Sequence, residues 1–106
     1  MKLNILGTEY DYAESTAKED VRLAENYGYY DFSERIIRIE SEYNENDPNA
    51  ISDFDVLKDK VIRHEIIHAF MYESGMREWT EDEKLVDWLA IQFPKMLKAF
   101  QEVHCI

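Results

Sequence analysis

The feature that most constrains the fold is a long apolar segment in the middle of the chain, residues 53–74, which stops at Gly75. Its spacing predicts one helix, because glycine is the residue type that commonly follows a helix end. Apolar side chains such as Leu57, Ile62 and Phe70 fall on different faces of this helix. A helix that is apolar all round has to be covered on most sides, so we expect it at the centre of the domain.

This helix carries an HExxH pentad, His64 to His68. Residues four apart lie on one face of a helix, about 5–6 Å apart, so His64 and His68 can bind a single metal ion. Glu65 is about 100° further round, beside the two histidines, where a general base acting on water would stand. Two hydrogen-bonded core histidines are the alternative, and the complete pentad favours the metal site.

A catalytic zinc ion typically has three protein ligands and keeps a fourth position for water. The candidates for the third ligand are Glu83, Asp87, Glu73, Glu78, Asp82 and His104. We favour Glu83, because a turn after Gly75 would fold a second helix back across the first. Asp87, one turn on, could then accept a hydrogen bond from a ligand histidine. Against this, Thr80 to Glu83 also has the spacing of a capping box, in which Glu83 would bond back to the Thr80 amide.

Glu65 is the candidate general base, which would take a proton from water and deliver it to a leaving amine. Tyr72 lies one turn beyond His68 on the same face and is a candidate donor to the oxyanion, although a core aromatic is the commoner role for such a tyrosine. His104 and Cys105 are a pair of soft ligands at the chain end, where we expect a disordered tail. A tail that folded back could instead shield the metal.

The remaining pattern predicts one α+β domain over residues 1–106, with a small sheet and a β-hairpin packed on the central HExxH helix. The expected elements are a strand at 2–6, a short helix at 16–25, hairpin strands at 27–32 and 35–40, a loop at 41–52 and a second helix from Thr80. Pro94 interrupts the second helix, so we expect a kink between Ala90 and Pro94.

The net charge indicates which partners to expect, and the cysteine content indicates the cellular compartment. The net charge is −11, from 23 acidic and 12 basic residues. Such a surface repels phosphate backbones and anionic lipids, so we expect neither nucleic acid nor a membrane as partner. The single cysteine and the polar residues within the first twelve positions predict a cytoplasmic protein.

The pentad together with Glu83 to Ala90 (EKLVDWLA) and the following Phe93-Pro94 resembles the ImmA/IrrE family of small zinc metallopeptidases. The resemblance covers about residues 61–94, with valine at position 86 where the family usually has a small alanine. More broadly the pattern is similar to gluzincins. It implies a minimal zincin core, with His64, His68 and Glu83 as zinc ligands, Glu65 as base and Asp87 supporting a ligand histidine.

Members of this family are often encoded by phages and mobile elements beside a repressor that they inactivate. The resemblance therefore implies a zinc-dependent endopeptidase that cuts a specific protein partner, such as a transcriptional repressor. We expect the hairpin edge at 35–40 to pair with the extended substrate. The alternative is an acidic, zinc-stabilised interaction module or inhibitor without peptidase activity, in which a fourth protein ligand would close the metal site. The oligomeric state is left open by the sequence.

Overall fold

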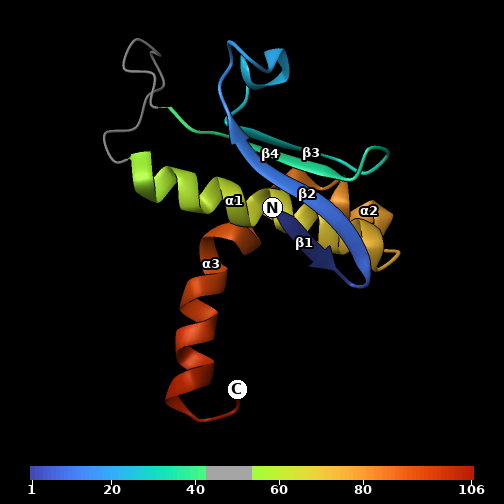
Figure 1. The fold of residues 1–106 in the computed structure, drawn as a ribbon. Coiled ribbons are helices and arrows are strands. Elements are labelled where there is room, and N and C mark those ends of the chain that lie inside the picture. The colour runs from blue at the N-terminus through green and yellow to red at the C-terminus, as the bar shows by residue number, and fades with distance from the viewer. Residues whose placement is uncertain (43–53) are drawn as a thin grey trace.

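The computed structural model describes residues 1–42 and 54–106. Within these ranges the chain forms an α+β fold, in which a four-stranded sheet covers one side of the central helix α1 (Figure 1). The elements in chain order are β1 (Lys2–Ile5), β2 (Thr8–Ser15), the 3-10 helix η1 (Val21–Leu23), β3 (Gly28–Asp31), β4 (Ile36–Glu40), α1 (Phe54–Glu73), α2 (Arg77–Thr80) and α3 (Glu83–Glu102). The predicted central helix is confirmed, and the predicted loop at 41–52 lies outside the described residues except for its first two.

The sheet has the strand order β1-β2-β4-β3. β1 and β2 form a hairpin through Leu6 and Gly7, which have φ angles of 51° and 91°. β3 and β4 form the antiparallel hairpin expected from the sequence, whereas β2 and β4 run parallel. The prediction of 35–40 as the sheet edge was wrong. β2 was not recognised in the sequence. Because it pairs with β4, β4 becomes an inner strand, and β3 is the edge strand of this hairpin.

The core lies between the sheet and α1. Ile37 and Ile39 of β4 are at most 1% exposed and pack towards α1, where Ala69 is fully buried. Gly28 of β3 passes so close to the helix that an added Cβ would lie 2.7 Å from Val61 Cγ1. This close approach places the edge strand directly over the pentad helix.

The predicted helix at 16–25 was wrong, because only the 3-10 turn η1 forms there. The Asp20 side chain accepts a hydrogen bond from the Arg22 amide, which is the local bonding that competes with a continuous helix. Arg22 then binds Asp31 and the Tyr29 hydroxyl of β3, with distances of 3.0 and 2.9 Å. These tertiary contacts hold the segment against the sheet.

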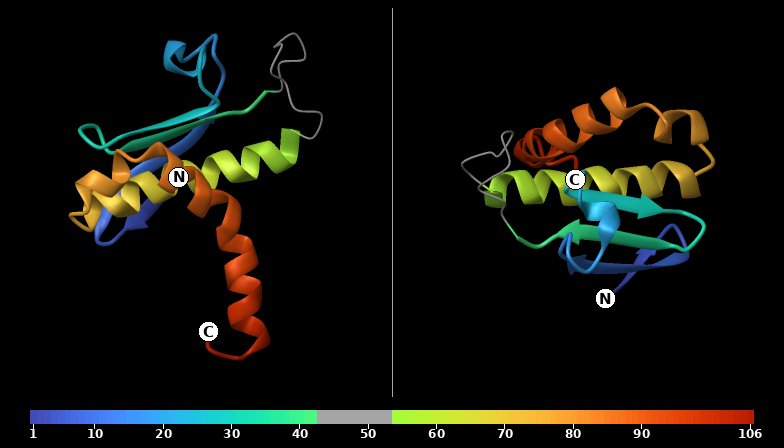
Figure 2. Two further views of the ribbon diagram at one scale, coloured as in Figure 1. Left: turned by 180° about the vertical axis from the view of Figure 1, so that it is seen from behind. Right: turned by 90° about the horizontal axis from the view of Figure 1, so that it is seen from above.

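The second long helix, α3, begins at Glu83 rather than at Thr80, because Asp82 is its N-cap. Pro94 lies inside α3, and the helix changes direction partway along, as expected for a proline (Figure 2). Proline has no amide hydrogen, so the Ala90 carbonyl loses its helical partner, and Arg63 Nε of α1 donates to it at 2.7 Å instead. No helix in the described ranges has the length and apolar character needed to cross a membrane.

Candidate metal centre

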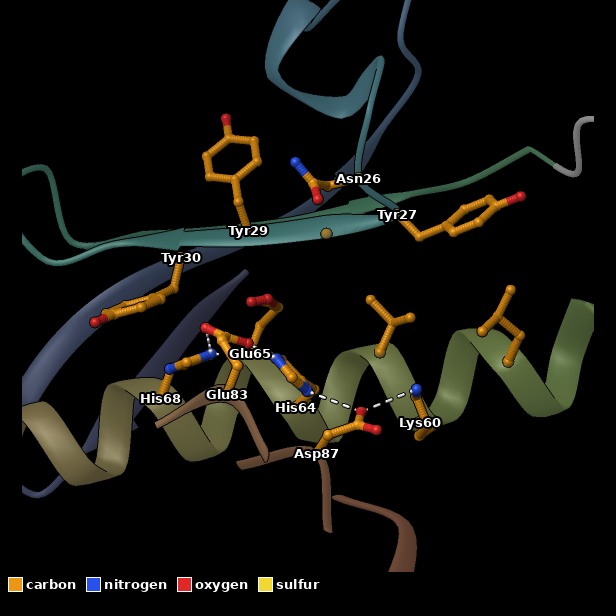
Figure 3. A pocket seen from close by; sticks show the side chains of 13 residues that line it. Asn26, Tyr27, Tyr29, Tyr30, Lys60, His64, Glu65, His68, Glu83 and Asp87 are labelled. Carbon is orange, nitrogen blue, oxygen red and sulfur yellow. Dashed lines mark hydrogen bonds and ion pairs between the residues drawn. The ribbon is translucent and has the colours of Figure 1, made fainter. Parts of the chain in front are cut away.

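Three side chains converge at the middle of α1 and the start of α3 (Figure 3). His64 Nε2 lies 3.0 Å from Glu83 Oε2, and His68 Nε2 lies 3.0 Å from Glu83 Oε1. The two Nε2 atoms are 3.1 Å apart. Ligands bound tetrahedrally at zinc distances of 2.0–2.1 Å would be about 3.3 Å apart. The donor set and its spacing therefore fit a metal ion.

Of the carboxylates and the histidine considered as third ligand, Glu83 is the one that the structure brings to both pentad histidines. The competing capping box does not form. Asp82 Oδ1 accepts the hydrogen bond from the Leu85 amide at 3.1 Å, and Asp82 thereby caps the helix. The Glu83 side chain is left free to face the histidines, as Figure 3 shows.

Asp87 orients the His64 ring by a hydrogen bond at Nδ1, the nitrogen that does not face Glu83. Asp87 Oδ1 lies 3.3 Å from His64 Nδ1 and 2.9 Å from Lys60 Nζ. The hydrogen bond from Lys60 is the main cause that lowers the pKa of Asp87 below its usual value, with a smaller contribution from His64. An ionised Asp87 accepts a hydrogen bond from Nδ1–H, so the proton stays on Nδ1 and His64 Nε2 keeps a lone pair for a metal.

His68 is oriented by Thr80, a residue that sequence analysis did not assign to the site. The Thr80 hydroxyl donates to the His68 carbonyl at 2.9 Å, and His68 Nδ1 lies 3.1 Å from the same oxygen. Because its one hydrogen is already used, Thr80 Oγ1 accepts from Nδ1–H. The arrangement selects the tautomer in which His68 Nε2 has the free lone pair.

Tyr30 of β3 completes this network. Its ring stacks on His68 at a centroid distance of 4.9 Å, and its hydroxyl lies 3.1 Å from Thr80 Oγ1. Thr80 can accept this second hydrogen bond, since a hydroxyl oxygen has two lone pairs. The sequence contains no local signal for either residue, because α2 brings Thr80 back under the pentad and the hairpin brings Tyr30 over it.

Burial sets the charge state of the two pentad residues nearest the core. Glu65 is 6% exposed, and burial raises its pKa to about 7, with repulsion from Glu83 as the smaller cause. His68 is 3% exposed, and burial holds its pKa below the usual value. A neutral imidazole is the form that binds metal.

Three residues that the sequence offered as candidates for the site lie elsewhere. The Tyr72 ring stacks on Phe32 at 4.4 Å, and its hydroxyl accepts a hydrogen bond from Arg77 at 3.3 Å. Tyr72 is not among the residues that line the cleft beside the histidines, so the structure gives no support for its role as oxyanion donor. His104 and Cys105 are exposed and follow α3 near the C-terminus, which lies well away from α1 (Figure 1).

The site opens into a cleft of about 470 Å³ between β3 and α1. Gly28, Tyr29 and Tyr30 of the edge strand form one wall, and Glu65 and the three candidate ligands lie in the other. Lys60 lines the same cleft and contributes a positive charge. The geometry therefore combines a candidate metal ion, a buried carboxylate and a strand edge around one open space.

The comparisons with known proteins return no relative. No protein-family model matches the chain, and no curated protein and no solved structure is significantly similar to it. The candidate site consequently depends on the residues and geometry described above.

Proposed function

We propose that the protein is a zinc-dependent endopeptidase that cuts an extended segment of a specific protein partner, such as a transcriptional repressor. The observation that carries the proposal is the convergence of His64, His68 and Glu83 beside Glu65 in an open cleft. Two imidazoles and one carboxylate are a donor set used by catalytic zinc. The resemblance of the two motifs to ImmA/IrrE peptidases supports the same function, with the fold acting as a minimal zincin core.

A zinc ion bound by these residues would supply a Lewis acid that polarises the scissile carbonyl and lowers the pKa of water to about 7. Glu65 would take the proton from the attacking water and deliver it to the leaving amine. Asp87 and Thr80 hold the two imidazoles with their Nε2 atoms directed at one point. Fixed ligands reduce the reorganisation that catalysis would otherwise require.

The edge strand β3 is the better candidate for binding substrate than the 35–40 strand favoured by the sequence. β3 borders the cleft and is one of the two edge strands of the described sheet. A segment of a partner could add to this edge as an extended strand, with its backbone hydrogen-bonded to β3. Its scissile carbonyl would then lie over the pentad.

The experiment is to incubate zinc-loaded protein with candidate repressors and with a peptide library, and to identify new termini by mass spectrometry. The matched variants are Glu65→Gln, which should abolish cleavage while retaining zinc, and Glu9→Gln, which removes an exposed carboxylate from β2 and should cut normally. Casein should be cut slowly or not at all, because selectivity would come from an extended surface. Equal cleavage by wild type and Glu65→Gln would contradict the assigned mechanism.

The second candidate function is the acidic interaction module, which the net charge of −11 favours. A structural zinc site is closed by a fourth protein ligand. In the described part of the chain, the candidate cluster offers three ligands and adjoins the cleft. Stoichiometric zinc without cleavage of any partner would shift the assignment to this module.

A further inference from the structure

A second cavity lies on the face of the sheet that is turned away from α1. Ile37 and Ile39 of β4 pack towards α1. The next residue, Glu40, points to the opposite face, because successive side chains of a strand alternate. η1 packs against β3 and β4 on that face (Figure 1). Residues 23–27 and Glu40 border a cavity of about 110 Å³ there, which we call the Glu40 pocket.

The lining of the Glu40 pocket is partly aliphatic and partly acidic. The aliphatic residues are Ala17, Leu23 and Ala24. The acidic residues are Glu25, Glu40 and Glu42. No lysine, arginine or histidine is among the described residues that line it. The pocket is therefore suited to a ligand that has an apolar stem and a positive charge.

Glu40 is the buried member of the acidic group, with 8% of its surface exposed. Its Oε1 accepts a hydrogen bond from the Glu42 amide at 3.3 Å. Its Oε2 is buried and has no hydrogen-bond donor in the described part of the chain. Buried polar atoms are nearly always hydrogen-bonded, because an unsatisfied one costs free energy. A ligand that donates a hydrogen bond to Oε2 would remove this cost.

A lysine side chain fits the pocket better than a metal ion or an arginine. Among the described residues, the group of side chains close enough to hold a metal is the candidate centre on α1 and α3. The glutamates of the pocket thus do not converge as calcium requires, with its about six to eight oxygen ligands. Arginine typically binds both oxygens of a carboxylate, and one oxygen of Glu40 is already used. An ammonium group on an aliphatic stem can use the remaining oxygen.

The Glu40 pocket adjoins the metal cleft at the start of β3. Asn26 and Tyr27 line both cavities (Figure 3). Tyr27 precedes Tyr30, which stacks on His68, by three residues, or about 10 Å of extended chain. A segment added to the β3 edge would direct alternate side chains to the α1 face and to the η1 face. One side chain could therefore enter the pocket while the backbone crosses the cleft.

We propose that the Glu40 pocket binds a lysine side chain of the protein partner, about three residues from the bond that is cut. The selection of a cleavage site in this way rests on the proposed endopeptidase function. Binding of the lysine side chain itself needs neither zinc nor Glu65, so the two proposals can be tested apart.

The first test measures binding without hydrolysis. N-acetyl-lysine methylamide is added to ¹⁵N-labelled protein in the presence of a chelator, and the amide resonances are followed by NMR. The amides of Leu23, Ala24 and Glu42 should shift. The norleucine analogue has no ammonium group and should bind at least about tenfold more weakly. Equal binding of both analogues, or the same shifts with calcium chloride alone, would overturn the proposal.

Two variants locate the binding. Glu40→Gln keeps the shape of the side chain and removes its charge, so it should raise the dissociation constant of the lysine analogue at least about tenfold. Glu9→Gln is the matched control, because it removes the same charge from an exposed position on β2 and should bind like wild type. An unchanged dissociation constant in Glu40→Gln would place the ligand elsewhere and overturn the proposal.

The second test asks whether the pocket selects the bond that is cut. Zinc-loaded wild type should cut a peptide library with lysine enriched at one fixed distance from the new terminus. Glu40→Gln should lower kcat/KM for lysine peptides at least about tenfold and remove this enrichment. Cleavage by wild type without a preference for lysine overturns the proposal and leaves the endopeptidase function intact. If no peptide is cut, the endopeptidase function fails, while lysine binding that depends on Glu40 still supports the pocket.

Discussion

At the scale of single residues, the Thr80 hydroxyl links three polar groups of the candidate site. It bonds the His68 carbonyl, His68 Nδ1 and the Tyr30 hydroxyl at 2.9–3.1 Å. Thr80→Val keeps the shape and removes the hydroxyl that these three groups share. We expect zinc affinity to fall about 10–100-fold, the usual effect of removing a group that orients a ligand. Competition with a chelator measures this, and Thr80→Ser should retain most of the affinity. Unchanged affinity in Thr80→Val would remove the positioning role.

The neighbouring carboxylates give a matched comparison. Glu83→Gln should weaken zinc binding most, because it replaces a charged ligand that lies 3.0 Å from both histidines. Asp82→Asn should have little effect, since asparagine caps a helix as well as aspartate does. Asp87→Asn should lie between them, at about 10–100-fold. Zinc titration of the three variants tests this order. A larger loss of zinc affinity in Asp82→Asn than in Glu83→Gln would show that Glu83 is not the third ligand.

The buried Glu65 makes the stability of the zinc-free protein depend on pH. Its pKa is raised from 4.5 to about 7, so the folded state binds more protons than the unfolded state within this window. The contribution of Glu65 to the free energy of unfolding should be fully present below pH 4.5 and should be lost as the pH rises through 7. Glu65→Gln removes this dependence on pH. With chelator present, the free energy of unfolding of wild type should therefore fall by up to about 3 kcal/mol more than that of Glu65→Gln between pH 4 and pH 8. Urea unfolding at both pH values measures the difference, and a constant difference would show that Glu65 ionises normally.

At the scale of elements, the bend of α3 is coupled to α1 through one hydrogen bond. Arg63 Nε binds the Ala90 carbonyl, which Pro94 leaves without a helical donor. Arg63→Ala should destabilise wild type by about 1.5–3 kcal/mol, as expected for a charged hydrogen bond. In Pro94→Ala the helix supplies its own amide, so the same change should cost less. A double-mutant cycle by urea unfolding measures the coupling. Equal costs in both backgrounds would show that the two residues act independently.

The sheet contains one strand pairing that local sequence predicts, the β3–β4 hairpin, and one between segments distant in the chain, the parallel pairing of β2 with β4. The β3–β4 hairpin joins strands that are four residues apart, and its pattern is visible in the sequence. The β2–β4 pairing joins segments about 25 residues apart. No short-range pattern determines such a pairing, and this is why the edge strand was assigned incorrectly.

At the scale of the whole molecule, the candidate ligands come from two helices, so metal binding should stabilise the fold. His64 and His68 are on α1 and Glu83 is on α3. A metal that binds the folded state alone stabilises it by about 4 kcal/mol at a concentration a thousand times its dissociation constant. Thermal unfolding with and without zinc should show this gain in wild type, and His64→Ala should lose it. A zinc-induced shift that persists in His64→Ala would place the binding elsewhere.

The sequence by itself determined the features that depend on neighbouring residues. The four-residue spacing of His64 and His68 puts them on one face of any helix, and a proline in the interior of a helix bends it. Tertiary structure decided the rest. It assigned capping to Asp82 and not to Thr80, brought Thr80 and Tyr30 to His68, and made β3 rather than β4 an edge strand. These outcomes depend on contacts between segments distant in the chain, whose energies are set by packing and burial that no local pattern contains.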